Sequence, residues 1–189
     1  MPEHNTNIVE DNVEAELYEV DQLREQYPGW DDLEADEKLD VLADTEPADT
    51  VTAHNIITEP FRNYLSELIN PDVTTQGAID TTHMAFGDDN TTPSLSDAHL
   101  INEIYRDQIN DHVDRTGAEY AGTILIQSDE AVGDNLVEAA LVTESDSANA
   151  DDIALNRVVL TDSRLDPKDD DHAVTVTISL SFLDESEAV

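Results

Sequence analysis

The stretch VTVTISLSF, residues 174–182, indicates the class of fold because apolar and polar side chains alternate strictly along it. Valine, isoleucine, leucine and phenylalanine fall on one face, and threonine and serine fall on the other. A period of two residues is typical of a β-strand that has one face in a core and one polar face. This part of the chain therefore predicts a long strand of an antiparallel sheet. Its apolar face consists of Val174, Val176, Ile178, Leu180 and Phe182.

Three shorter segments earlier in the chain also predict strands. They are EYAGTILIQS (119–128), NLVEAALVT (135–143) and IALNRVVLT (153–161). Clusters of Asp, Ser, Asn and Gly separate them, and such clusters are typical of turns between strands. We therefore expect the chain after Gly117 to form an antiparallel β-sheet or sandwich.

The segment FGDDNTTPSLSDAHLINEIYR, residues 86–106, predicts a turn followed by a capped helix. The run Gly87-Asp88-Asp89-Asn90 has the composition of a turn. Ser94 and Asp97 have the spacing of a capping box, with Ser96 as an alternative cap. A turn and a helix start are thus expected in close succession.

The residues after this cap follow a helical spacing with one buried face. We expect a helix from Ser96 to Arg106 that continues to an end between residues 112 and 117. The apolar side chains on its buried face are Leu100, Ile101, Ile104, Tyr105 and Ile109.

The first 72 residues suggest short helices joined by loops. Residues 1–16 are polar and predict a flexible or partner-ordered arm. Thr58 is placed to cap a helix that has Pro60 in its first turn. Helical spacing groups Leu17, Val20 and Leu23 on one face, Leu39, Leu42 and Ala43 on another, and Phe61, Leu65, Leu68 and Ile69 on a third.

These elements together predict an α+β fold. Residues 1–72 would form an N-terminal helical arm that serves as an attachment region. Residues 73–189 would form a domain in which a helix packs on an antiparallel β-sheet or sandwich.

The balance of charge is the dominant feature of the composition. Asp and Glu number 45 against 8 Lys and Arg, which gives a formal net charge of -37. At molar salt the Debye length falls to about 3 Å, so most of the resulting repulsion is screened. Because 39% of the residues are hydrophobic and fall into patterned runs, we favour a folded protein adapted to high salt over a disordered one. The scarcity of cations argues against direct nucleic-acid binding.

Targeting and membrane signals are missing from the sequence. The chain has no cysteine, so disulfides and thiolate metal sites are excluded. The segment MPEHNTNIVEDNVEAEL has neither a basic nor an apolar region of a secretory signal. No apolar run approaches the length of about 18 residues that a membrane span requires. We expect no membrane insertion, and a protein that is soluble or is carried outside the cell by an assembly.

Ligand sites and catalytic sites are poorly supported. Asp88, Asp89 and Asn90 are weak candidates for a hard cation, because they are adjacent rather than alternate as in an EF-hand loop. The six histidines show no zinc-site spacing, and no serine lies in a nucleophile elbow. We therefore expect no metal, no cofactor and no enzymatic activity.

Two of the six arginines lie inside patterned elements and need a partner. Arg106 could satisfy helix carbonyls or pair with a carboxylate such as Glu138, and Arg157 lies in a predicted strand. Each arginine could form a partly buried interaction within the chain or a contact between subunits, and the sequence does not decide between these two alternatives.

The order of these pieces resembles tail-fibre and baseplate-associated proteins of tailed phages. Those proteins often carry a glycine-containing turn, T-x-P, S/T-D-x-x-L-x-x-E-I/V-x-R, a strand with E-x-G-L, a strand with arginine and a final alternating strand. This chain departs from that pattern at Ala140, where the family usually has glycine, and at Asp88-Asp89-Asn90. Its matching pieces are Gly87, TTP (91–93), SDAHLINEIYR (96–106), EAAL (138–141), LNRVVL (155–160), Lys168 and VTVTISLSF, within residues 78–183.

The resemblance, together with the charge, implies a structural protein of a tailed virus that infects haloarchaea. It would be a baseplate or tail-fibre attachment component that mediates assembly and, indirectly, host adsorption. It would be assembled in the host cytoplasm, reside in the virion tail, and contact other tail proteins. A homo-oligomer is implied, with a trimer favoured. The implied oligomerisation and assembly residues are Leu100, Ile104, Tyr105, Arg106, Glu138 and Arg157.

Two other functions stay open. A capsid vertex or turret component would use a similar attachment module. A host-receptor or glycan-binding module would need exposed aromatics in a groove, and the single tryptophan, Trp30, lies outside the predicted sheet.

Overall fold

The computed structural model describes residues 12–68, 81–115, 119–143, 152–161, 165 and 167–181. These residues form a mixed α+β fold that consists mostly of strands, with three α-helices and two antiparallel sheets. None of the helices in the described parts of the chain has the length and apolar character needed to cross a bilayer.

The first sheet has five strands in the order β2-β1-β10-β7-β6. Its longest strand, β10, alternates as the sequence predicts: Val174, Val176 and Ile178 are buried. Phe182, the last residue of the predicted strand, lies outside the described residues. The strands are β1 (Asn12–Glu19), β2 (Asp49–His54), β6 (Asp111–Arg115), β7 (Glu119–Ile126) and β10 (His172–Ser181).

The second sheet also has five strands, in the order β3-β9-β8-β4-β5. The expected strands around residues 135–143 and 153–161 are confirmed as β8 and β9. The strands are β3 (Ile56–Ile57), β4 (His83–Gly87), β5 (Glu103–Gln108), β8 (Glu138–Val142) and β9 (Asn156–Val159).

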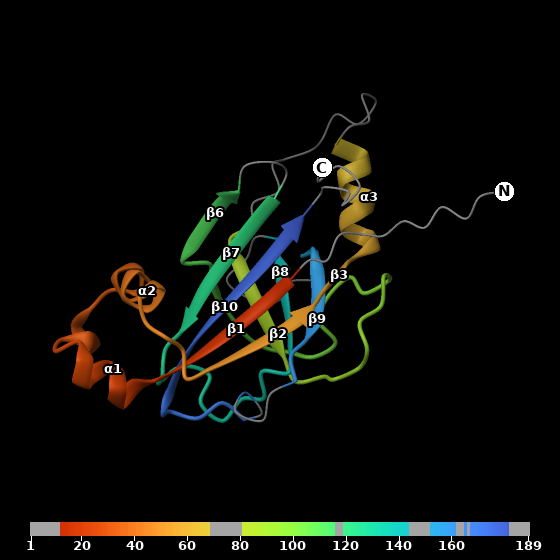
Figure 1. Ribbon diagram of the computed structural model, residues 1–189. Coiled ribbons are helices and arrows are strands. Elements are labelled where there is room, and N and C mark those ends of the chain that lie inside the picture. Colours follow the sequence, from red (N-terminus) through yellow and green to blue (C-terminus); the bar gives the residue numbers. More distant parts are fainter. Residues whose placement is uncertain are drawn as a thin grey trace.

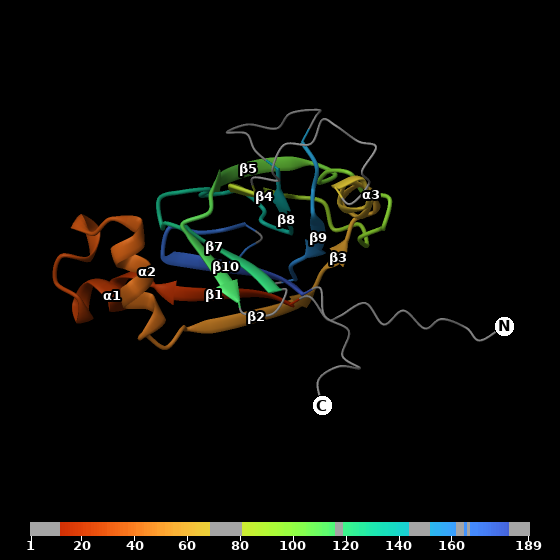
Figure 2. The same ribbon diagram turned by 90° about the horizontal axis from the view of Figure 1, so that it is seen from above.

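One hydrophobic cluster joins the two sheets, which lie as two layers in Figure 2. Strands of both sheets supply its fully buried side chains, so neither sheet has a separate core. Its members include Val13, Ala15 and Leu17 of β1, Met84 and Phe86 of β4, Ile124 and Ile126 of β7, Ala139 and Leu141 of β8, Val158 of β9, and Val174, Val176, Ile178 and Leu180 of β10.

A second cluster lies under the helices at one end of the first sheet. The helices are α1 (Val20–Gln26) and α2 (Ala35–Ala43), joined through a 3-10 turn, η1 (Trp30–Asp32). Trp30 packs there with Leu125 of β7 and other apolar side chains. The Lys38 ammonium lies 5.6 Å from the centre of the Trp30 ring and donates to Gln127 Oε1 at 2.5 Å. Lys38 therefore ties α2 to the end of β7.

The third helix, α3 (Glu59–Leu68), stands at the opposite end of the molecule from α1 and α2 (Figure 1). Its start confirms the expected cap, since the Phe61 amide donates to Thr58 Oγ1 at 3.3 Å. Phe61 is buried and Leu65 packs against the main core.

The division into an arm (1–72) and a domain (73–189) is wrong for the described residues. β1 lies between β2 and β10, and β3 pairs with β9, so strands from both sides of residue 72 share both sheets. Leu17 belongs to β1 rather than to a helix. The physical reason is a period of two from Val13 to Leu17, in which two glutamates alternate with three buried apolar residues.

The expected helix from Ser96 to Arg106 is also wrong. Residues 88–102 form a loop, and the chain then enters β5, which pairs with β4. The Phe86 and Tyr105 rings face each other across that pair with centroids 6.0 Å apart. Tertiary pairing of β5 with β4 thus overrides a local helical spacing. Where the helix was expected to end, the chain forms β6.

We predict that removal of residues 1–72 abolishes folding. The deletion takes away β1, β2 and β3, and with them three fully buried side chains of β1, which lies between β2 and β10 in the first sheet. The fragment 73–189 should show no cooperative urea transition by far-UV circular dichroism in molar KCl, whereas the full chain should. A sharp, reversible transition of the fragment would contradict the shared core.

Candidate functional site

The loop 88–102 lies across the outer face of the second sheet. Met84 and Phe86 of β4 point into the main core, so Ala85 and Gly87 point to the opposite face. Leu100 of the loop packs there on a group of small and apolar side chains, and Ala154 donates its amide to Ala98 O at 2.9 Å. Small residues under the loop let the backbone approach the sheet closely. The residues of this outer cluster are Ala85, Leu100, Ala140, Val142 and Ala154.

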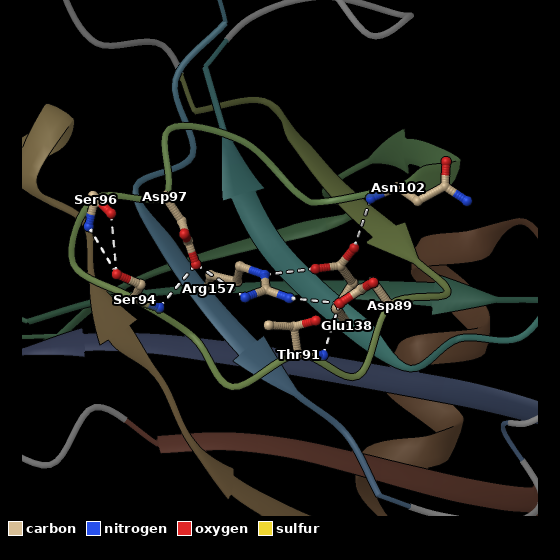
Figure 3. A network of polar contacts seen from close by, with 8 residues as sticks. All are labelled: Asp89, Thr91, Ser94, Ser96, Asp97, Asn102, Glu138 and Arg157. Carbon is tan, nitrogen blue, oxygen red and sulfur yellow. Dashed lines mark hydrogen bonds and ion pairs between the residues drawn. The ribbon is translucent and has the colours of Figure 1, made fainter.

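A buried ion pair lies beneath the same loop. Arg157 Nε of β9 donates to Glu138 Oε2 of β8 at 2.6 Å, and the two side chains are 1% and 0% exposed. Arg157 Nη1 also donates to Asp97 Oδ2 at 2.9 Å. Figure 3 shows Arg157 at the centre of these contacts. One guanidinium thus joins two carboxylates, one from the sheet and one from the loop.

Glu138 holds the far end of the loop through its other oxygen. The Asn102 amide donates to Glu138 Oε1 at 3.0 Å, and the Asn102 side chain donates to Asp88 Oδ1 at 2.7 Å. Gly87 lies against this contact, because a Cβ at that position would come 2.6 Å from Asn102 O and would also meet the Glu138 carboxylate. Glycine is therefore required at residue 87 by close approach.

The middle of the loop is folded by local hydrogen bonds. The Ser94 amide donates to Asp97 Oδ2 at 2.8 Å, as in half of a capping box, although no helix follows. The Ser96 amide donates to Ser94 Oγ at 3.4 Å. The same Asp97 carboxylate therefore organises its own loop and binds Arg157.

Asp89 is a third carboxylate near Arg157, in addition to Glu138 and Asp97. Its Oδ1 lies 3.7 Å from Arg157 Nη2, which is an ion pair too long for a hydrogen bond. Hydrogen bonds from Thr91 lower the pKa of Asp89, and the charge of Arg157 lowers it further. A lowered pKa means that the Asp89 carboxylate favours the folded loop above its ordinary pKa, and this contribution is lost as pH falls through the folded value.

A second buried arginine network lies on β5. Arg106 Nε donates to Glu103 Oε1 at 2.7 Å, and its Nη1 donates to Asp152 Oδ2 at 2.7 Å. The Arg106 and Asp152 side chains are 5% and 6% exposed. The expected partner of Arg106, Glu138, pairs with Arg157 instead.

The six residues expected to mediate assembly lie in three different places. Leu100, Glu138 and Arg157 meet at or beneath the loop, and Arg106 lies on β5 with the second network. Ile104 and Tyr105 pack against the main core. Sequence reasoning missed Asp97, Asn102, Glu103 and Asp152 as partners of these charges. The only signal in the sequence was the scarcity of arginine, which indicated that an arginine inside a patterned element needs a specific partner.

The weak metal candidates have other contacts. Asp88 accepts from Asn102, and Asp89 accepts from the Thr91 amide at 2.7 Å and faces Arg157. Among the described residues, no group of three or more histidine and acidic side chains is placed to hold a metal ion.

The outer surface of the loop presents two large apolar side chains. Leu95 is 47% exposed and Ile101 is 54% exposed. Leu95 O accepts from the Glu59 amide at 2.6 Å, so the loop also contacts the start of α3.

Comparisons of the chain with protein-family models, with curated proteins and with solved structures found no match. The contacts of the loop and its arginine are therefore the basis for any functional proposal.

We predict that Arg157→Met lowers the free energy of unfolding by about 3–5 kcal/mol, because it leaves the buried Glu138 carboxylate without its cation. Urea titration at fixed molar KCl measures this without changing ionic strength. The double variant Arg157→Met with Glu138→Gln should recover part of the loss. Arg24→Met, which removes an exposed ion pair, should change stability little. If the losses of the two single variants simply added up in the double variant, the proposed stabilising interaction between Arg157 and Glu138 would be contradicted.

We also predict that Gly87→Ala costs about 1–3 kcal/mol, because the added methyl group must displace Glu138 or the Asn102 carbonyl. The control is Gly133→Ala, where a Cβ would meet nothing within 4 Å but the backbone has a φ of 85°. Only Gly87→Ala should increase hydrogen exchange of the Asn102 amide. If hydrogen exchange of the Asn102 amide is unchanged in Gly87→Ala, the close approach is not the reason for glycine at residue 87.

Proposed function

We propose that the protein is a structural component of the virion of a halophilic tailed virus, in the baseplate or at the site of tail-fibre attachment. The observation that carries the proposal is the 88–102 loop, which is held from beneath by buried charges and exposes Leu95 and Ile101. The loop would form the assembly contact with another tail protein.

The residues that carry the resemblance to tail-fibre and baseplate-associated proteins support this proposal by their position. Asp97 of the loop, Glu138 of β8 and Arg157 of β9 belong to one network (Figure 3), and Gly87 lies against its Glu138 carboxylate. Residues that an attachment module needs for its loop geometry would be expected to converge in this way. The two sheets would act as a β-sandwich that supports the loop.

The charge distribution supports a protein that works in brine. A net charge of -37 would repel itself strongly at low salt and is screened at molar salt. Exposed ion pairs lose most of their strength under the same conditions, whereas a pair as buried as Glu138–Arg157 is screened much less. A loop meant to hold its shape in brine is therefore best fixed by buried charges.

Incorporation into particles tests the proposal. Purified particles from an infected haloarchaeal culture should contain the protein, and immunogold labelling should decorate the tail. Leu95→Ser with Ile101→Ser should reduce incorporation several-fold, whereas Val132→Ser, at another exposed apolar side chain that is 50% exposed, should not. Labelling at capsid vertices would favour a turret component, and absence from particles would overturn the proposal.

We predict that the protein unfolds when salt is removed, because the Debye length grows from about 3 Å at 1 M to about 30 Å at 0.01 M. The near-UV circular dichroism signal should disappear on desalting and return when KCl is restored. A signal that persists at low salt would argue against adaptation to brine.

A further inference from the structure

One continuous segment forms an edge of both sheets. β2 is the last strand of the first sheet, and β3, which follows it after Asn55, is the last strand of the second. Within the described residues β2 pairs along one side only, with β1. Figures 1 and 2 show β2 and β3 running along the same side of the molecule. Among the described residues no strand pairs with the other side of β2, which offers backbone donors and acceptors.

Beyond Asp49 at its start, this edge carries no charge, although acids occur along most of the chain. From Thr50 to Thr58 there is no Asp, Glu, Lys or Arg, although 45 of the 189 residues are acidic. Proteins that keep an edge strand from pairing usually place charges, proline or a bulge on it. The register of β2 with β1 is unbroken from Asp49 to His54, so no bulge interrupts the strand, and after Asp49 it carries neither a charge nor a proline.

The core is also incomplete at this edge. Val51 and Ala53 point inward and pack against the main core, yet both are only partly buried. Their neighbours on β1, Ala15 and Val13, are fully buried at 0% exposure. One more strand beside β2 would remove the remaining apolar surface of Val51 and Ala53 from water.

We propose that the occupant of this edge is β2 of a second copy of the chain, paired antiparallel about a two-fold axis near Thr52. Thr52 would lie opposite Thr52 of the second copy, and Val51 opposite Ala53. Each residue then faces one of the same parity, so the apolar side chains stay on the inner face and the threonines on the outer face. The first sheets of two copies would form one continuous sheet.

Charge identifies a second copy as the occupant. Two chains of net charge -37 repel each other wherever their carboxylates meet. An uncharged edge is where two such chains can approach without opposing acids, whereas a basic partner would be drawn to the acidic surface elsewhere. The pairing is isologous and closes as a dimer rather than the trimer that the resemblance implies. It concerns the purified chain and goes beyond the proposed role in the virion.

Single-cysteine variants test the geometry, because the chain has no cysteine of its own. Thr52→Cys should be cross-linked to a covalent dimer by a short bis-maleimide in molar KCl. Thr92→Cys, the same substitution at an exposed loop position, is the control and should cross-link at least ten-fold more slowly. Equal rates for the two variants would overturn the proposal.

Light scattering after size exclusion tests the assembly. The wild type and Thr92→Asp should elute at twice the chain mass of 20.8 kDa in molar KCl, and Thr52→Asp should elute as a monomer. In Thr52→Asp two carboxylates would face each other across the two-fold axis. The circular dichroism spectrum of Thr52→Asp, compared with wild type, reports whether it folds; if it does not, the cysteine pair decides. A monomeric or trimeric wild type, or a folded Thr52→Asp that remains dimeric, would overturn the proposal.

Discussion

The buried pair of Glu138 and Arg157 is the interaction on which the arrangement of the second sheet's outer face depends. Two charges removed from water are tolerated only when further hydrogen bonds satisfy their remaining lone pairs and protons. Asn102 supplies such a bond to Glu138 from the end of the loop and Asp97 accepts one from Arg157 in its middle, while Asp89 faces Arg157 Nη2 at 3.7 Å. The path of the loop follows from this requirement, and Gly87 leaves the space through which it passes.

Four of the eight cations of this chain are shown to lie inside the fold. Lys38, Lys168 and Arg157 are buried, and the Arg106 side chain is 5% exposed, in a chain with 8 Lys and Arg. Lys168 Nζ donates to the Ser128 and Asp169 carbonyls at 3.2 and 3.0 Å, and burial lowers its pKa. Each of these four cations joins segments distant in sequence, while most of the described acids are exposed or partly exposed. This division suits a solvent that weakens exposed ion pairs and leaves buried ones intact.

Sequence reasoning predicted the strands with clear alternation, but it failed where two periods compete. β10 was predicted because its apolar and polar residues alternate strictly, and α3 because Thr58 and Pro60 mark its start. In the segment of β5, Ile104 fits a helical spacing as well as a strand, and only pairing with β4 decides between them. The sequence indicated that Arg106 and Arg157 each need a partner. Asp152 and Asp97, which pair with them, lie in loops whose course no local pattern predicts.

The position of the single tryptophan gives the docking of α1 and α2 a fluorescence signal. Trp30 lies in the cluster between the helices and the first sheet, beside Lys38, and belongs to neither the main core nor the 88–102 loop. Its fluorescence therefore reports on the docking of α1 and α2, while far-UV ellipticity averages over all helices and strands. If the helices detach before the sheets separate, the two probes will follow different denaturation curves, and the order of disassembly can be observed without any added label.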